Sequence, residues 1–113
     1  AGAFPLWLAP EQVRVLPVSD KLMHYADKVA GELKQAGLRV HVDRSSERVN
    51  AKIRNAQELK LPYMLVVGGK DEQAGAVSVR ERTRGDLGAM LLELFIDQAR
   101  AEIATHGREA VTV

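Results

Sequence analysis

The apolar run Tyr63–Val67, which ends at the pair Gly68-Gly69, constrains the fold more than any other part of the chain. Its residues do not alternate between polar and apolar types. A continuous run of this kind is typical of a strand that is buried on both faces. A sheet with such a central strand needs helices on both sides. The run therefore predicts an α/β domain with three layers.

Strands and helices are expected to alternate around this run. β-rich or alternating residues predict strands over 12–18, 38–43 and 77–80, and apolar residues at helical spacing predict helices over 21–36, 47–60 and 92–106. Right-handed crossovers then give the strand order 2-1-3, with the fourth strand antiparallel at one edge. We expect three helices and a mixed, mostly parallel sheet of four or five strands, the fifth lying near residues 83–87.

Polar residues that precede the helices predict their N-caps. Ser19 and Asp20 stand before the first helix, and Ser45 and Ser46 stand before the second. After the central strand, residues 68–75 are expected to form a polar loop. Gly68-Gly69-Lys70 resembles a phosphate-binding turn, but it lacks the spacing of the P-loop motif, so a plain loop is favoured.

The composition indicates one globular domain. The chain has 113 residues, 27% of them charged, a net charge of +1 and no cysteine. These values exclude a disulfide framework, a thiolate metal site and a polycationic tail, and they are compatible with the reducing cytoplasm. The longest uncharged stretch, residues 1–10, is far too short to span a membrane.

The two ends of the chain differ from its middle. The chain begins at Ala1 rather than Met, and residues 4–10 are apolar apart from the two prolines that bracket Trp7. We therefore expect residues 1–10 to be an extended linker arm from a preceding domain of a longer protein. The domain itself is expected over residues 11–106, followed by a frayed tail over 107–113.

No sequence pattern of an enzyme active site is found. His24, His41 and His106 are scattered, and none is spaced to share a metal ion with another ligand. In the predicted topology, the loops after the first three strands meet at one edge of the sheet, where α/β folds usually bind ligands. This edge would carry Ser19-Asp20, the start of the second helix and the loop after the central strand.

Positive charge collects in the middle of the chain, where residues 39–60 contain six basic and three acidic residues. Polar faces of the second helix carry Arg48, Asn50, Lys52 and Arg54, and the polar face of the fourth strand carries Arg80 and Arg82. Arginine binds base edges and phosphates bidentately and stacks on unpaired bases. This pattern is compatible with a nucleic-acid partner, but a solvated helix face and a charged edge strand also explain it.

Five segments together resemble the C-terminal anticodon-binding domain of threonyl-tRNA synthetases, a family of class II aminoacyl-tRNA synthetases. In chain order they are Gly2–Val13, Lys52–Gln57, Pro62–Gly68, Val77–Arg80 and Gly85–Gly88. The motif F-P-x-W-L-A-P-x-Q in the first segment, where the catalytic domain of that family ends, is specific. The third segment is shared more loosely with prolyl-, histidyl- and glycyl-specific relatives.

This resemblance implies a domain that grips the anticodon loop of the threonine tRNA and reads the G and U at its second and third positions. Arg80 matches the family's base-reading arginine. Asp71 stands where the family usually has Glu, and Ser46 where many members have Asn. Supporting RNA contacts are expected from Ser45, Arg48, Asn50, Lys52, Arg54 and Arg82.

The resemblance also implies a parent enzyme, a cytoplasmic homodimer that attaches threonine to its tRNA. ATP, magnesium and zinc would act in its catalytic domain. We expect the present chain to be inactive alone and to need no cofactor, because it contains none of those motifs. Two alternatives remain open. One is a stand-alone α/β domain that binds a protein, or binds a ligand at Gly68-Gly69-Lys70; the other is the anticodon-binding domain of a prolyl-type synthetase.

Overall fold

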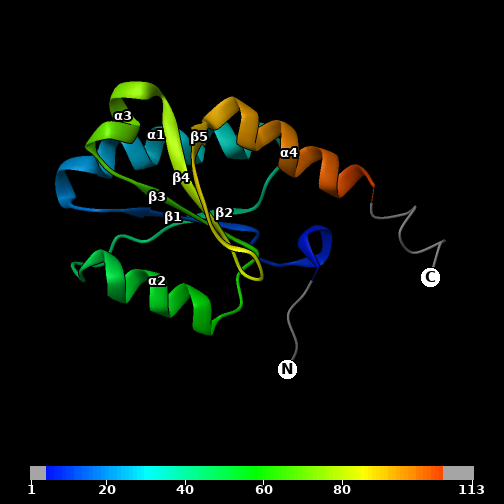
Figure 1. Cartoon of the computed structure of the whole chain (residues 1–113), viewed down its shortest axis with the longest axis horizontal. Helices are drawn as coiled ribbons and strands as arrows, with labels where there is room; N and C mark the ends of the chain where they lie inside the picture. Colours follow the sequence, from blue (N-terminus) through cyan, green and yellow to red (C-terminus); the bar gives the residue numbers. More distant parts are fainter. Residues whose placement is uncertain (1–4, 106–113) are drawn as a thin grey trace.

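The computed structural model describes residues 5–105, which form three layers. A five-stranded sheet lies between helices α1 (Met23–Gln35) and α4 (Leu92–Ala104) on one face and helix α2 (Val49–Glu58) on the other (Figure 1). A short helix, α3 (Gly69–Ala74), and two 3-10 turns, η1 (Leu6–Leu8) and η2 (Asp20–Leu22), complete the helical elements. The three-layer α/β architecture predicted from the central apolar run is confirmed.

The sheet has the strand order β2-β1-β3-β4-β5. Its strands are β1 (Val13–Pro17), β2 (Val40–Val42), β3 (Tyr63–Val67), β4 (Ala76–Glu81) and β5 (Gly85–Leu91). β1 pairs in parallel with both β2 and β3, whereas the pairs β3–β4 and β4–β5 are antiparallel. The predicted order 2-1-3 and the antiparallel fourth strand are confirmed. The fourth strand, β4, is not at an edge of the sheet, because β5 pairs along its outer side. β5 also extends well beyond the predicted residues 83–87.

Two apolar clusters hold the layers together. The larger one joins α1 and α4 to one face of the sheet, to which β1, β3 and β4 contribute fully buried residues such as Val15, Leu65 and Val79. The smaller one joins Ala56 of α2 to residues of the opposite face that include Leu16 and Met64. Successive residues of β1 and β3 thus point into different clusters, so the middle of the sheet is buried on both faces.

The predicted side-chain N-caps are absent from both helices. Ser19 is extended before η2 and its side chain makes no capping hydrogen bond. Helix α2 begins at Val49, after Arg48, and not at Ser45 or Ser46. The amide of Ser45 instead donates to Oδ1 of Asp43, at 2.9 Å. This local turn gives the backbone an alternative to the helix and delays its start.

The predicted loop over residues 68–75 is also wrong, because α3 occupies most of it. The described residues therefore contain four α-helices rather than three. The carboxylate of Asp71 accepts the Gly68 amide at 2.8 Å and so stabilises the first turn. Gly75, with φ of +65°, ends the helix in the left-handed conformation.

The described part of the predicted linker arm is not extended, whereas its place as a linker from a preceding domain stays a prediction. Residues Leu6–Leu8 form η1, and Leu6 and Ala9 are buried. Nε2 of Gln12 donates to the Leu6 carbonyl, and Nε of Arg39 donates to the Ala9 carbonyl, both at 2.9 Å. This segment therefore packs on the domain. The rest of the arm at 1–4, the predicted tail at 107–113 and His106 lie outside the described residues.

Candidate nucleic-acid interface

The face of the sheet that α2 only partly covers carries Arg80, the arginine predicted to read an RNA base. Along β4, Val77 and Val79 are buried against α1 and α4, whereas Ser78 and Arg80 are half-buried on the opposite face. Arg80 is paired with Met64 of β3, which packs under α2. Arg80 therefore lies beside α2, on the side of the sheet where a ligand can reach it.

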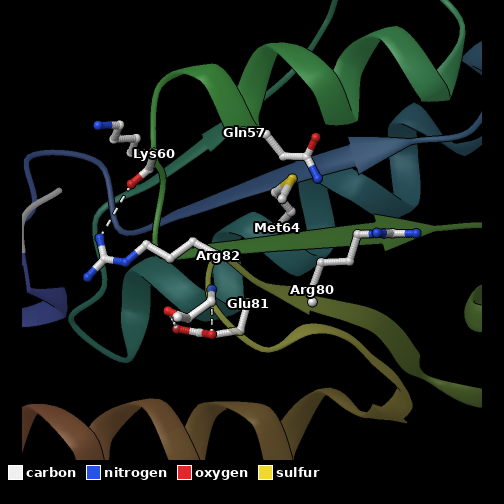
Figure 2. A pocket seen from close by; sticks show the side chains of 8 residues that line it. Gln57, Lys60, Met64, Arg80, Glu81 and Arg82 are labelled. Atoms are coloured by element: carbon white, nitrogen blue, oxygen red, sulfur yellow. Dashed lines mark hydrogen bonds between the residues drawn. The ribbon is translucent and has the colours of Figure 1, made fainter. Parts of the chain in front are cut away.

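A cavity of about 300 Å³ opens next to Arg80. It lies between the end of α2, strands β3 and β4, and the turn that joins β4 to β5 (Figure 2). Its lining residues are Gln57, Lys60, Met64, Arg80, Glu81, Arg82, Thr83 and Gly85. The wall thus combines the apolar Met64 with hydrogen-bonding groups, as small-molecule sites commonly do.

The two arginines of the cavity differ in what their guanidinium groups contact. Arg82 donates from Nη1 to the Lys60 carbonyl, at 3.4 Å. Within the described residues 5–105, Arg80 makes only a long ion pair, 3.9 Å from Nη2 to Oδ2 of Asp86. The two side chains point in opposite directions, Arg80 toward the carboxyl end of β3 (Figure 2). Because a guanidinium has five N–H donors, Arg80 keeps most of its hydrogen-bonding capacity for a ligand.

The backbone of Lys60 is strained where it borders this cavity. Its φ of +56° places a non-glycine residue in the left-handed region just after the end of α2. Such residues are uncommon and are often found at functional sites. The conformation accompanies the contact between the Lys60 carbonyl and Arg82, so the end of α2 is joined to the end of β4.

The turn that forms another wall of the cavity is held by one carboxylate. Oε1 of Glu81 accepts the amides of Thr83 and Arg84, at 2.8 and 2.6 Å. Burial tends to raise the pKa of Glu81, but these hydrogen bonds and the charge of Arg84 outweigh it, so the pKa lies below its ordinary value. The ionised carboxylate therefore stabilises the turn.

Asp71 lies on α3, and β4 provides one of its contacts. Its carboxylate accepts the Gly68 amide through Oδ2 and the Ser78 hydroxyl through Oδ1, at 2.8 and 3.2 Å. Gly68-Gly69-Lys70 does open a helix, contrary to the predicted loop. However, the carboxylate of Asp71 already accepts the amide of the N-cap residue Gly68. An anion could not bind that amide as well, which disfavours the anion-binding alternative.

A second, smaller cavity of about 230 Å³ lies at the carboxyl edge of the parallel strands. It is lined by Val18, Ser19, Asp20, Ser45, Ser46, Glu47, Arg48 and Lys52. The structure thus brings together four of the predicted RNA-binding residues there, and Arg80 and Arg82 at the first cavity. Asn50 and Arg54 are exposed on α2 and line neither of these two cavities.

Lys52 differs from the other predicted RNA contacts because it is buried, with an exposed fraction of 2%. Its Nζ donates to the Pro17 carbonyl at the end of β1, at 3.1 Å. This ammonium group therefore stabilises the fold, and it can reach a ligand only through the second cavity.

Six residues that line the first cavity were not predicted from the sequence to bind RNA, namely Gln57, Lys60, Met64, Glu81, Thr83 and Gly85. Met64 belongs to the apolar run that predicted the core, and only its pairing with Arg80 shows that it borders a binding surface. The pattern of residues along the chain does not contain that information.

Known proteins identify the family. A family model described as "Anticodon binding domain" matches residues 12–102. The chain belongs to this family. Among curated relatives of this anticodon-binding domain, the threonine–tRNA ligase of Thermus thermophilus is 51% identical over 111 residues, which is 98% of this chain and 17% of the relative. That of Syntrophomonas wolfei is 56% identical over 94 residues, 83% of this chain and 15% of the relative. The domain thus spans about a sixth of the proteins that it matches.

Solved structures agree with this assignment. The RNA binding domain of threonyl-tRNA synthetase from Cryptosporidium parvum superimposes with a TM-score of 0.83 at 35% identity, covering 89% of this chain and 26% of the other. A histidyl-tRNA synthetase from Nostoc superimposes with a TM-score of 0.77 over 84% of this chain and 23% of the other. At 22% identity, that second likeness shows the fold alone.

Within residues 5–105, no three His, Asp or Glu side chains come together as metal ligands. Over the same residues, no helix combines the length and apolarity that crossing a bilayer requires.

Proposed function

We propose that this anticodon-binding domain is the C-terminal part of a threonine–tRNA ligase and binds the anticodon loop of the threonine tRNA. It would read the second and third anticodon bases, G and U. The observation that carries the proposal is the loosely paired Arg80 beside a cavity on the open face of the sheet. The relatives that match nearly the whole chain support it, because they are threonine–tRNA ligases.

Recognition requires no chemical step by this domain. Unstacked loop bases offer their edges and faces to a protein. In our proposal one base lies at the first cavity, where Met64 provides an apolar contact. The guanidinium of Arg80 leaves the cavity toward the carboxyl end of β3 and donates to acceptor atoms of the base at the cavity edge. The volume of about 300 Å³ is at the small end of known ligand sites and suits a single base rather than a larger group.

Asp71 and Ser46 complete the proposed base contacts. The carboxylate of Asp71 can accept hydrogen bonds from the N–H groups of a base. Arg80 cannot bind these groups, because a guanidinium has only donors. Ser46 lies at the second cavity and can donate or accept through its hydroxyl. Phosphate contacts would come from the exposed residues around these sites, namely Ser45, Arg48, Asn50, Arg54 and the less exposed Arg82, and from Lys52 only through the second cavity.

We assign threonine attachment, which takes place in the cytoplasm, to the remainder of the parent protein. ATP, magnesium and zinc would supply adenylate formation and substrate binding in that remainder. The parent is expected to be a homodimer.

Replacing Arg80 tests this proposal. Arg80→Ala is expected to weaken binding of a threonine anticodon stem-loop about 5- to 150-fold, since a bidentate arginine–base contact contributes about 1–3 kcal/mol. It should also reduce the preference over a stem-loop with altered second and third bases. Fluorescence titration of both RNAs measures the two effects.

Arg100→Ala is the matched control. Arg100 is exposed on α4, in the layer on the opposite side of the sheet from α2, so its removal should leave both affinities unchanged. An equal loss of affinity in both variants would indicate general electrostatic attraction and would contradict the proposed role of Arg80.

A further inference from the structure

The carboxylate of Asp71 is held from two directions. The Gly68 amide, which precedes α3, donates to Oδ2, and the Ser78 hydroxyl, which belongs to β4, donates to Oδ1. Ser78 also lies 3.5 Å from Oδ2. An acid at this place in a helix commonly binds the amide at the helix start. The contact from Ser78 is additional, and it joins the acid to the strand that carries Arg80.

Ser78 and Arg80 lie on the same face of β4. They are two residues apart, about 7 Å along a strand, and both are half-buried. Ser78 pairs with Val66, near the carboxyl end of β3, and the guanidinium of Arg80 points toward that end (Figure 2). The acceptor held by Ser78 and the donors of Arg80 are therefore directed to one region of the sheet.

We infer that Ser78 is a positioning residue for anticodon reading, a role that rests on the function proposed above. Its hydroxyl fixes the carboxylate of Asp71 on the Arg80 side of the sheet, so that the acid and the guanidinium meet the RNA as one rigid set. A carboxylate has about four acceptor positions, and Gly68 and Ser78 occupy two of them. The remaining positions are available for N–H groups of a base.

Rigidity is the physical reason for this role. A carboxylate that rotates freely can turn toward several donor arrangements, and it loses conformational entropy when a base orders it. A carboxylate that is already fixed favours the one donor arrangement that fits. Loss of the Ser78 hydroxyl should therefore reduce the discrimination between anticodon loops while the domain stays folded.

A double-mutant cycle on the 113-residue chain tests this inference. The wild type, Ser78→Ala, Ser78→Thr, Asp71→Ala and the double variant Asp71→Ala/Ser78→Ala are each titrated with the threonine anticodon stem-loop and with a stem-loop whose second and third anticodon bases are altered. Ser78→Ala is expected to lower the preference for the threonine loop about five-fold, the scale of the net contribution of one ordinary hydrogen bond. Ser78→Thr keeps the hydroxyl and should keep the preference. In an Asp71→Ala background, Ser78→Ala should have no additional effect.

Several outcomes would overturn the inference. Wild-type preference in Ser78→Ala would show that the hydroxyl does not position the acid. So would the same loss of preference in Ser78→Thr as in Ser78→Ala, or fully additive effects of Ser78→Ala and Asp71→Ala. If Asp71→Ala loses the preference and Ser78→Ala does not, the proposed function stands and only the positioning role fails. If the wild type itself shows no preference, both fail.

Discussion

Lys52 shows most clearly how the function of a residue depends on its burial. A basic residue on an amphipathic helix is normally solvated, and in the sequence it looks like a phosphate contact. The structure buries it and directs Nζ to the Pro17 carbonyl. Burying a charge is costly unless hydrogen bonds compensate for it. The charge of Lys52 also favours the ionised form of Asp43. Burial tends to raise the pKa of Asp43, but hydrogen bonds from Ser45 and the charge of Lys52 lower it, so the pKa lies below its ordinary value.

Replacing Lys52 by Met should therefore lower stability. Lys52→Met keeps the aliphatic stem but leaves the Pro17 carbonyl without its donor, at an expected cost of about 1–3 kcal/mol in the free energy of unfolding. For a domain of this size, each kcal/mol lowers the melting temperature by about 4–8 °C. Thermal unfolding measures the change. Lys28→Met, at an exposed position of α1, should change it little. An unchanged or raised melting temperature in Lys52→Met would show that the carbonyl does not need this donor.

Among the elements, the strands were more predictable than the starts of the helices. The run Tyr63–Val67 was assigned correctly because burial on both faces leaves a strong signal in the sequence. Helix α2 starts later than predicted because Asp43 accepts the Ser45 amide, and neither residue type distinguishes this turn from a helix cap. Helix α3 was missed because its start, Gly68-Gly69, is typical of a loop.

Only part of the candidate site was predictable from the sequence. Arg80 was found because its place in the strand and the family resemblance both indicate it. The cavity beside it was not predictable, because it depends on how β4 pairs with β3 and on where α2 ends. Residues such as Gln57 and Lys60 carry no pattern of their own that indicates a binding surface.

The β4–β5 turn is an element whose stability should depend on pH. The pKa of Glu81 is lower in the folded state than its ordinary value near 4.5. Ionised Glu81 therefore stabilises the fold above that value, and the contribution is lost as the pH falls through the lower folded pKa. Between about pH 7 and about pH 3, the free energy of unfolding should fall by on the order of 1 kcal/mol less in Glu81→Gln than in the wild type.

Urea unfolding at several pH values measures this effect. Glu58→Gln, at an exposed position at the end of α2, serves as the control and should follow the wild-type profile. If Glu81→Gln also follows it, the carboxylate does not hold the turn.

At the scale of the whole molecule, charge is distributed unevenly although its sum is only +1. Basic residues predominate over residues 39–60, which include α2, whereas α4 has three acidic residues and one basic residue. Because α2 and α4 lie on opposite faces of the sheet (Figure 1), RNA should approach from the α2 side. A small basic region is enough for a domain that reads a few unstacked bases.

This distribution predicts a modest dependence of RNA affinity on salt. If two or three phosphates are neutralised, the logarithm of the association constant should fall with the logarithm of salt concentration with a slope of about −1.5 to −2. Titrations between about 50 and 200 mM salt give this slope. A slope several times steeper would indicate binding through many phosphates and would contradict recognition by a small patch.

The central claim is that this domain reads the anticodon bases, and the most direct measurement is the affinity of the wild-type chain for two matched stem-loops. One carries the threonine anticodon bases, and the other differs only at the second and third positions. We expect the first to bind about 5- to 150-fold more tightly, the discrimination given by one well-formed bidentate contact. Equal affinities for the two stem-loops would contradict the account.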